Sequence, residues 1–121
     1  SDTPRRSVEA LARRAGIDIP GEGDVRANRL DGLGPLGGLA TGVLTGAVAG
    51  LLRALGVRPG PLAGPVAVGA AAMAAAGSSL AALGVSDPRT WDAADWLSDA
   101  VPHLAYGAVT AGTLRALTPD P

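Results

Sequence analysis

Hydrophobic and polar positions are separated along this chain into long blocks. Residues 32–52 and 59–86 contain no charged side chain, and these uncharged stretches are 21 and 28 residues long. A helix needs about 20 apolar residues to cross the hydrocarbon core of a bilayer. The pattern therefore predicts two transmembrane helices, at about 33–55 and 62–83.

A third span is predicted closer to the C-terminal end, where residues 100–114 contain no Asp, Glu, Lys or Arg. We expect it at about 101–117, preceded by a helix at about 88–100 that lies at the membrane surface. Trp91 and Trp96 fall within this surface helix. Rings that are half apolar and half wet are typical of the interface between headgroups and hydrocarbon, so both tryptophans are predicted interfacial anchors.

The N-terminal block has the opposite character, because residues 1–31 carry six arginines and six acidic residues. It is predicted to be a polar arm with a short amphipathic helix. Pro4 suits the first turn of that helix and Gly16 suits its exit. The arm either docks lightly on the other helices or lies on the membrane surface. Residues 118–121 form a short tail.

These elements together predict the fold class: an all-α, helical integral membrane protein with about three transmembrane helices and glycine-zipper packing. The alternative is a soluble, alanine-rich helical bundle. The chain is 121 residues long, which is enough for one domain.

Glycine recurs at every fourth position of the first predicted span. A glycine inside a helix costs roughly 1 kcal/mol relative to alanine in water, so a row of them would weaken a soluble helix. In a membrane, helices associate through the close contact that small residues permit, and GxxxG spacing is the signature of such contact. The predicted helix-packing row consists of Gly34, Gly38, Gly42, Gly46 and Gly50.

The sequence leaves the partner of this glycine row open. Inside the chain, the candidates are small residues at matching spacing: Ala70, Ala74 and Ser78 on the second span, and Ala108 and Gly112 on the third. Outside the chain, the partner is a second copy or another membrane subunit. The neighbouring row of the second span is less smooth, because Met73 stands between Gly69 and Gly77.

A polar stripe is the constellation in this chain with the most chemical potential. Its residues are spaced 3, 4, 4, 3, 4 and 3 apart: Asp92, Asp95, Asp99, His103, Tyr106, Thr110 and Thr113. On a continuous helix they fall within an arc of about 80°. Pro102 complicates the stripe, because it removes a helical hydrogen bond and is expected to kink or restart the helix.

Three interpretations of this stripe remain open. In the structural one, the aspartates cap and solubilise a helix, Asp99 bonds His103, and the threonines bond nearby backbone. In the second, the stripe is a proton or cation pathway, since polar groups at membrane depth usually face a bundle interior or a water-filled cavity. The third is a divalent metal site at Asp95, Asp99 and His103, which lacks an obvious fourth ligand, so no metal is expected.

Composition excludes several classes of function. The chain has no cysteine and no lysine, and all ten of its cationic residues are arginine. Disulfides, thiolate chemistry and a P-loop are therefore ruled out. The single histidine has no partnered nucleophile, so we predict no catalytic residue, no enzyme activity and no cofactor. The net charge is -1 without a basic patch, which makes nucleic acid an unsuitable partner.

Two stretches, "RLDGLGPLGGLATGVLTGAVAG" and "LGVSDPRTWDAADWLSDAVPHLAYGAVTAGTLRAL", carry a family resemblance. Together they resemble small uncharacterised bacterial multi-spanning membrane proteins, loosely related to the YagU-like inner-membrane family. His103, Tyr106 and Gly107 are the residues that match near the last span. The resemblance covers about residues 30–117 and implies a location in the bacterial cytoplasmic (inner) membrane.

Arginine counts over whole loops favour a cytoplasmic N-terminus. The predicted function is that of a small non-enzymatic accessory or assembly subunit, with membrane lipid and other membrane subunits, or copies of itself, as partners. The alternative is a homo-oligomeric channel or proton- or cation-conducting unit built around Asp99 and His103.

Overall fold

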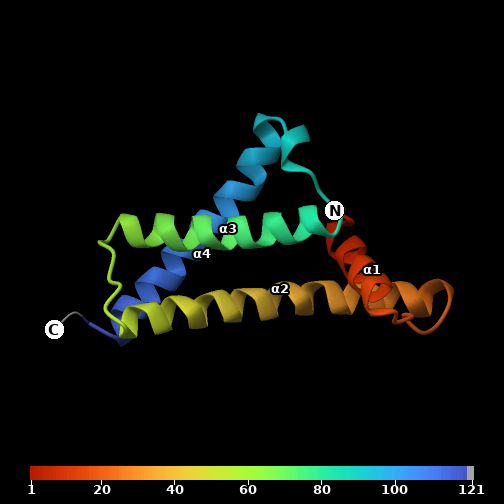
Figure 1. Ribbon diagram of the computed structural model, residues 1–121, viewed down its shortest axis with the longest axis horizontal. Helices are drawn as coiled ribbons and strands as arrows, with labels where there is room; N and C mark the ends of the chain where they lie inside the picture. Colours follow the sequence, from red (N-terminus) through yellow and green to blue (C-terminus); the bar gives the residue numbers. More distant parts are fainter. Residues whose placement is uncertain (120–121) are drawn as a thin grey trace.

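The computed structural model describes residues 1–119, and these residues form helices joined by short loops (Figure 1). The elements are α1 (Thr3–Ala15), α2 (Gly23–Ala54), α3 (Ala63–Ala82), the short 3-10 helix η1 (Pro88–Thr90) and α4 (Ala93–Leu117). The prediction of an all-α fold is confirmed.

Two of these helices, α2 and α3, are long and apolar enough to cross a membrane, judged by length and composition. They correspond to the first two predicted spans and run antiparallel beside each other (Figure 1). Within residues 1–119, α4 does not meet the same criterion, so the third span remains a prediction.

Helix α2 begins ten residues before the predicted start at residue 33. Its first turn contains Asp24, whose negative charge is favourable beside the partial positive charge of a helix N-terminus. Pro35 therefore lies inside the helix, beyond its first turn. The charged residues that precede the apolar span belong to the same continuous helix.

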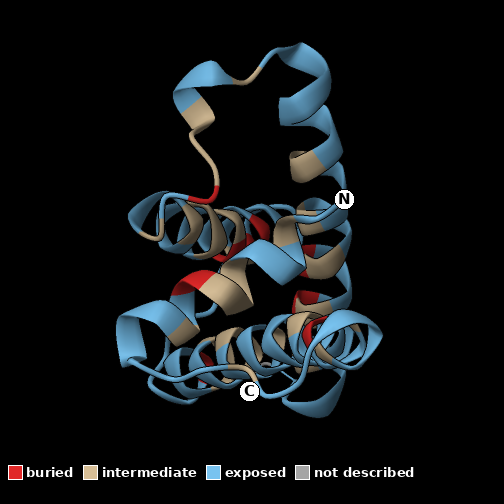
Figure 2. Cartoon of the chain, turned by 90° about the vertical axis from the view of Figure 1, so that its right-hand side faces the viewer, coloured by how far each residue is buried: buried red, intermediate tan, exposed pale blue. Residues whose placement is uncertain are grey.

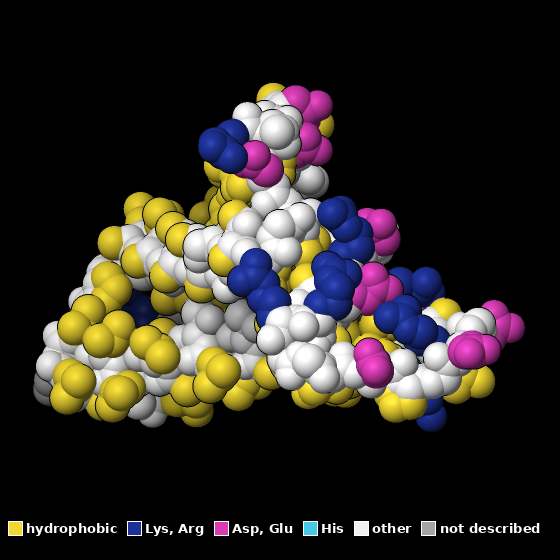
Figure 3. Space-filling view, turned by 45° about the vertical axis from the view of Figure 1, so that its right-hand side comes forward, with side chains coloured by type: hydrophobic (Ala, Val, Ile, Leu, Met, Phe, Trp, Pro, Cys, Tyr) yellow, Lys and Arg dark blue, Asp and Glu magenta, His cyan; other side chains and the backbone are white. Residues whose placement is uncertain are grey.

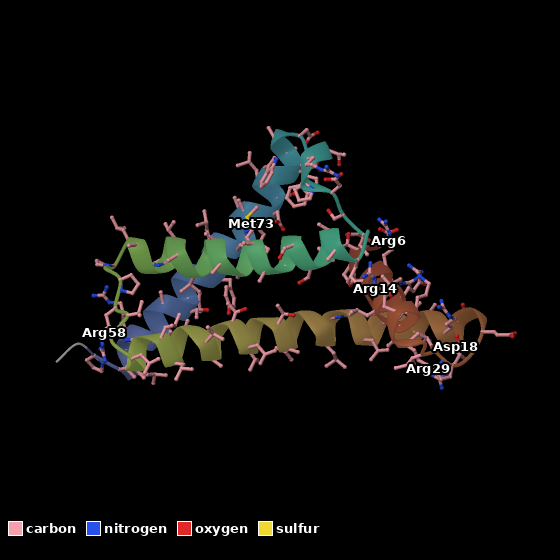
Figure 4. All side chains as sticks on the ribbon, viewed as in Figure 1. Arg6, Arg14, Asp18, Arg29, Arg58 and Met73 are labelled. Atoms are coloured by element: carbon pink, nitrogen blue, oxygen red, sulfur yellow. The ribbon has the colours of Figure 1, made fainter. Side chains whose placement is uncertain are left out.

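The N-terminal helix α1 packs against the first half of α2 (Figure 1). Arg5 forms a two-pronged ion pair with Asp31, and Arg26 pairs with Glu9 at 3.2 Å. Arg14, labelled in Figure 4, donates a hydrogen bond of 2.6 Å to the carbonyl oxygen of Ala82 at the end of α3. The arm therefore links the start of α2 to the end of α3.

Helices α3 and α4 make the most extensive contact in the fold, and α4 crosses α3 at a steep angle (Figure 1). The surface helix predicted at 88–100 and the span predicted at 101–117 fall largely on one continuous helix. One helix, α4, runs from Ala93 to Leu117 and contains Pro102 in its interior. Its N-terminal end and η1 project away from the other helices (Figure 1).

Very few side chains are buried in residues 1–119 (Figure 2). The buried apolar residues are Ala10, Leu30, Ala72, Val85 and Ala111. Three of them are alanines, which remove little apolar surface from water. None of the apolar 18-residue stretch of α2 is buried, and only 11% of that of α3 is.

Candidate functional site

The middle of the glycine row on α2 receives a tyrosine from α4. The hydroxyl of Tyr106 donates a hydrogen bond of 2.7 Å to the carbonyl oxygen of Gly42. A Cβ atom added at Gly42 would lie 3.7 Å from the Tyr106 ring, and one at Gly46 would lie 3.8 Å from its hydroxyl. The two glycines thus form a shallow slot for the ring, and Tyr106 ties α4 to α2.

The other members of the row meet different neighbours. A Cβ at Gly50 would contact Leu114 of α4 at 3.5 Å, and one at Gly34 would lie 2.7 Å from the Cβ of Pro4 in α1. A Cβ at Gly38 would meet no atom within 4 Å. The row therefore contacts side chains of two helices at four of its five positions, and no backbone-to-backbone helix crossing occurs along its apolar half.

The closest helix approach lies elsewhere, where Gly69 of α3 meets Gly107 of α4. A Cβ added at Gly69 would lie 2.7 Å from the carbonyl oxygen of His103, and one at Gly107 would lie 2.6 Å from the backbone nitrogen of Gly69. Both glycines are buried. Real Cβ atoms do not approach other atoms this closely. Glycine is therefore required at both positions for this crossing.

The small residues expected to pack on α3 point elsewhere. Ala70, Ala74 and Ser78 are exposed, and Gly112 of α4 has no atom within 4 Å of an added Cβ. The row that faces α4 instead includes Gly69. Met73, labelled in Figure 4, lies four residues further along α3 and is half-buried.

Sequence reasoning noticed Gly107 only through a family resemblance, although a signal was present. Gly107 and Ala111 are four residues apart on α4, and both are buried. This is the same small-xxx-small spacing that singled out α2. On α4 the motif is short and is surrounded by larger side chains, so it is easily overlooked.

The first part of the polar stripe stabilises the start of α4. The Asp92 carboxylate accepts a hydrogen bond of 2.9 Å from the backbone N–H of Asp95, and Asp95 accepts one of 3.1 Å from the N–H of Asp92. This reciprocal capping box satisfies two N–H groups that a helix N-terminus otherwise leaves without partners. Both aspartates therefore have a local role in the helix.

The second part of the stripe is the pair Asp99 and His103. The His103 Nδ1 lies 2.7 Å from the Asp99 carbonyl oxygen and 3.5 Å from its carboxylate. A carbonyl oxygen can only accept, so the imidazole carries a proton on Nδ1, and its neutral form has the lone pair on Nε2. Both side chains are partly exposed.

The remaining members of the stripe do not continue a chain of polar contacts. Thr113 donates to the carbonyl oxygen of Val109 within α4, and the methyl group of Thr110 lies beside Gly46. Tyr106 points to α2. The hydrogen bonds of these polar side chains run to residues 92–109 of the same segment or to α2. No group of three or more His, Asp or Glu residues suited to a metal ion occurs within residues 1–119.

The tip formed by η1 and the start of α4 carries the two tryptophans. Their rings meet edge to face with centroids 4.9 Å apart, and the Trp91 Nε1 donates to the Ser86 hydroxyl at 3.3 Å. Trp96 is 46% exposed. Asp87 caps η1 by accepting a hydrogen bond from the backbone N–H of Arg89.

The same tip contains a titratable pair. The Arg89 guanidinium donates two hydrogen bonds of 3.0 Å to the Asp87 carboxylate, and with the backbone N–H of Arg89 these bonds hold the pKa of Asp87 below its usual range. We expect Arg89→Gln to raise this pKa toward the ordinary aspartate value, as followed by an NMR pH titration of Asp87. Arg115→Gln at the opposite end of α4 should leave it unchanged. An unchanged pKa in Arg89→Gln would contradict the assignment.

A cavity of about 500 Å³ lies between the four α-helices. Helix α1 covers part of it, and the glycine row of α2 contributes Gly34, Gly38 and Gly42 to its wall. Its lining includes several polar side chains: Thr3, Ser7, Thr41, Thr45, Ser79, His103 and Tyr106. His103 and Tyr106 therefore line the same cavity, whereas Asp92, Asp95 and Asp99 do not.

A second, more apolar hollow of about 530 Å³ lies between α2, α3 and the last turns of α4, next to the loop that joins α2 to α3. Among residues 1–119, Arg53 and Arg115 are the charged residues that line it.

No protein-family model, curated protein or solved structure matches this chain. The resemblance to small bacterial inner-membrane proteins therefore stays a prediction.

Proposed function

We propose that this chain is a small, non-enzymatic integral membrane protein that serves as an accessory or assembly subunit by packing its helices against lipid and against other membrane subunits. One observation carries the proposal: the apolar side chains of α2 and α3 lie on the outside. Leu36, Leu39, Val43 and Leu44 of α2 and Val66 of α3 are all more than half exposed.

The core helix of a soluble protein also passes a test of length and hydropathy, but such a helix is mostly buried. Soluble monomers rarely expose contiguous apolar patches larger than a few hundred Å². A buried set dominated by alanines offers little hydrophobic stabilisation in water to offset that exposure. In a bilayer these apolar side chains are not exposed to water, because they contact lipid chains that are as apolar as leucine.

The glycines with free space beside them support the role of an assembly subunit. Added Cβ atoms at Gly77 of α3 and Gly112 of α4 would meet nothing within 4 Å. Each of these glycines has an exposed apolar residue three positions before it, Ala74 and Val109. A helix of another chain can approach closely at such positions, as GxxxG-type interfaces do. The inner-membrane location, the third span and a cytoplasmic N-terminus belong to the same proposal.

A specific observation also favours the alternative of a conducting unit. His103 and Tyr106 share their cavity with hydroxyl side chains from the other three helices, such as Ser7, Thr41 and Ser79. Hydroxyls and imidazole are groups that relay protons when water connects them. The contacts of His103 and Tyr106 with backbone carbonyls serve helix structure, which is why we rank this function second.

The test is fractionation of cells that produce the full chain, followed by native mass spectrometry after mild detergent extraction. We expect the protein in membranes after a carbonate wash and in a complex with other chains. A closed homo-oligomer would replace the accessory role by the conducting alternative. Recovery in the soluble fraction without detergent would overturn both.

A further inference from the structure

The apolar hollow between α2, α3 and α4 has the character of a binding site for a hydrocarbon chain. Its volume of about 530 Å³ lies within the usual range of small-molecule pockets, about 300–1,000 Å³. Its walls consist of leucine, valine, alanine, proline and glycine residues, with Thr45 and two arginines as the exceptions. Figure 3 shows the hollow ringed by hydrophobic side chains, with an arginine deep inside.

The charges of the hollow have one sign and lie at one end. Arg53 is in the last turn of α2 and Arg115 in the last turn of α4, and no Asp or Glu of residues 1–119 lines the hollow. Arg53 is only 6% exposed, and it donates hydrogen bonds to the backbone carbonyl and hydroxyl oxygens of Thr118. These bonds fix the end of α4 against α2 and keep a positive charge at the base of the hollow.

Arg115 completes this end of the hollow from the rim. It is exposed and lines the hollow beside Leu114. Arg58, labelled in Figure 4, lies in the adjoining loop, where it donates to the carbonyl oxygen of Thr118 at 3.3 Å. An occupant that is apolar along most of its length and negative at one end therefore complements the hollow.

We propose that this hollow binds one acyl chain of an anionic membrane lipid, with the lipid phosphate beside Arg115. The inference rests on the membrane location proposed above. The acyl chain lies against the alanine and valine side chains of α3, and the headgroup lies at the end where α2, α4 and the connecting loop meet.

The charge of the hollow favours a lipid chain over an apolar helix from a second copy. A helix with its side chains is about 10 Å across. A single hydrocarbon chain is much thinner and follows the hollow lengthwise. Residues 32–86 contain no Asp or Glu, so the apolar helices of a second copy would cover the Arg115 end of the hollow without supplying a carboxylate.

The experiment measures lipid binding to the purified full chain in dodecyl maltoside by native mass spectrometry. Dioleoyl phosphatidylglycerol is the anionic probe and dioleoyl phosphatidylcholine the zwitterionic one. We expect phosphatidylglycerol to bind about fivefold more tightly, the size of effect that one arginine near an anionic headgroup contributes. Arg115→Gln should remove this preference, whereas Arg89→Gln, which changes the same charge at the distant tip, should keep it.

A second pair of variants tests whether the chain occupies the hollow. Ala71 and Ala74 are both exposed alanines of α3, but only Ala71 lines the hollow. Ala71→Leu should weaken binding of both lipids by filling the space, and Ala74→Leu should bind like the unchanged protein. Circular dichroism of both variants verifies that each is folded.

Three results would overturn the inference. The first is equal binding of the two lipids by the unchanged protein. The second is a loss of lipid preference in Arg115→Gln while Ala71→Leu binds both lipids as tightly as the unchanged protein. That result would mean that the headgroup is attracted to the surface while the hollow stays empty of lipid. The third is loss of self-association in Ala71→Leu with lipid binding intact. A membrane-bound protein without lipid preference refutes this inference alone, whereas a protein in the soluble fraction refutes the proposed function.

Discussion

Replacing Gly107 with alanine is expected to force α3 and α4 apart and to lower the free energy of unfolding by about 3 kcal/mol, at the upper end of the usual cost of overpacking. The added methyl group would lie 2.6 Å from the backbone nitrogen of Gly69 and 2.9 Å from its Cα. These are backbone atoms of a helix, and no side-chain rotation can move them away. The helices themselves have to separate.

The contact that would be lost is the most extensive one between two helices in the fold. It includes the buried residue Ala111, whose Cβ lies 3.6 Å from a Cβ added at Gly64 of α3, as well as the two glycines. Its small side chains let the backbones approach closely, and dispersion attraction falls off steeply once a gap opens. A displacement of the crossing therefore weakens many contacts together.

The measurement is an SDS titration in mixed micelles, followed by energy transfer between dyes on Ser78→Cys and Val109→Cys. The chain has no cysteine of its own, so the two dyes label only the introduced sites, both of which are exposed. Gly112→Ala is the matched control on the same helix, where an added Cβ meets nothing within 4 Å. It should leave stability unchanged or raise it by up to about 1 kcal/mol through better helix propensity. Equal effects of the two substitutions would contradict the close crossing.

Hydropathy and charge were sufficient to predict the helices, because they depend on local composition. The uncharged stretches fall on α2 and α3, and helix is the structure in which an apolar segment satisfies its own backbone hydrogen bonds. The boundaries were less accurate where charge changed within a continuous helix. Residues 23–31 were assigned to the arm because they are polar, yet they form the first turns of α2.

Pro102 bears on the boundaries for a related reason. It was expected to kink or restart the helix near residue 101, and the helix does not restart there, because α4 continues through Pro102. A proline inside a helix removes one hydrogen bond, and its cost depends on the packing of the neighbouring turns. The capping box of Asp92 and Asp95 upstream and the crossing at Gly107 downstream stabilise α4 on both sides. Whether a helix continues through a proline therefore depends on contacts on both sides of it, and the presence of the proline alone does not predict the outcome.

The packing partners were the part that spacing alone did not determine. Helix α3 consists mostly of small residues, and composition favoured the row with Ala70 and Ala74, because Met73 interrupts the row with Gly69. In the structure the Gly69 row is the one that meets α4, where Gly69 lies against Gly107. The glycines of α2 were recognised as contact positions, but the side chain that fills them, Tyr106, was assigned to a polar stripe.

Tyr106→Ala is expected to lower the free energy of unfolding by about 3 kcal/mol, because it removes a large aromatic side chain together with its hydrogen bond. The Tyr106 ring occupies the slot at Gly42 and Gly46, and its hydroxyl bonds the Gly42 carbonyl oxygen at 2.7 Å. Contact between α2 and α4 is otherwise sparse. Loss of the ring therefore loosens α2 from the α3–α4 pair and leaves α1 and Arg53 as its main remaining attachments.

Tyr106→Phe separates the two contributions, since it keeps the ring and deletes only the hydroxyl. Its expected cost is about 1 kcal/mol, the usual net value of one hydrogen bond. Both variants are measured by the same SDS titration, with the dyes moved to Val43→Cys on α2 and Val109→Cys on α4, which are exposed. If the alanine variant were no less stable than the phenylalanine variant, the ring would not fill the slot. In that case the glycines of α2 would have to be available to another chain, and the row would be an interface between subunits.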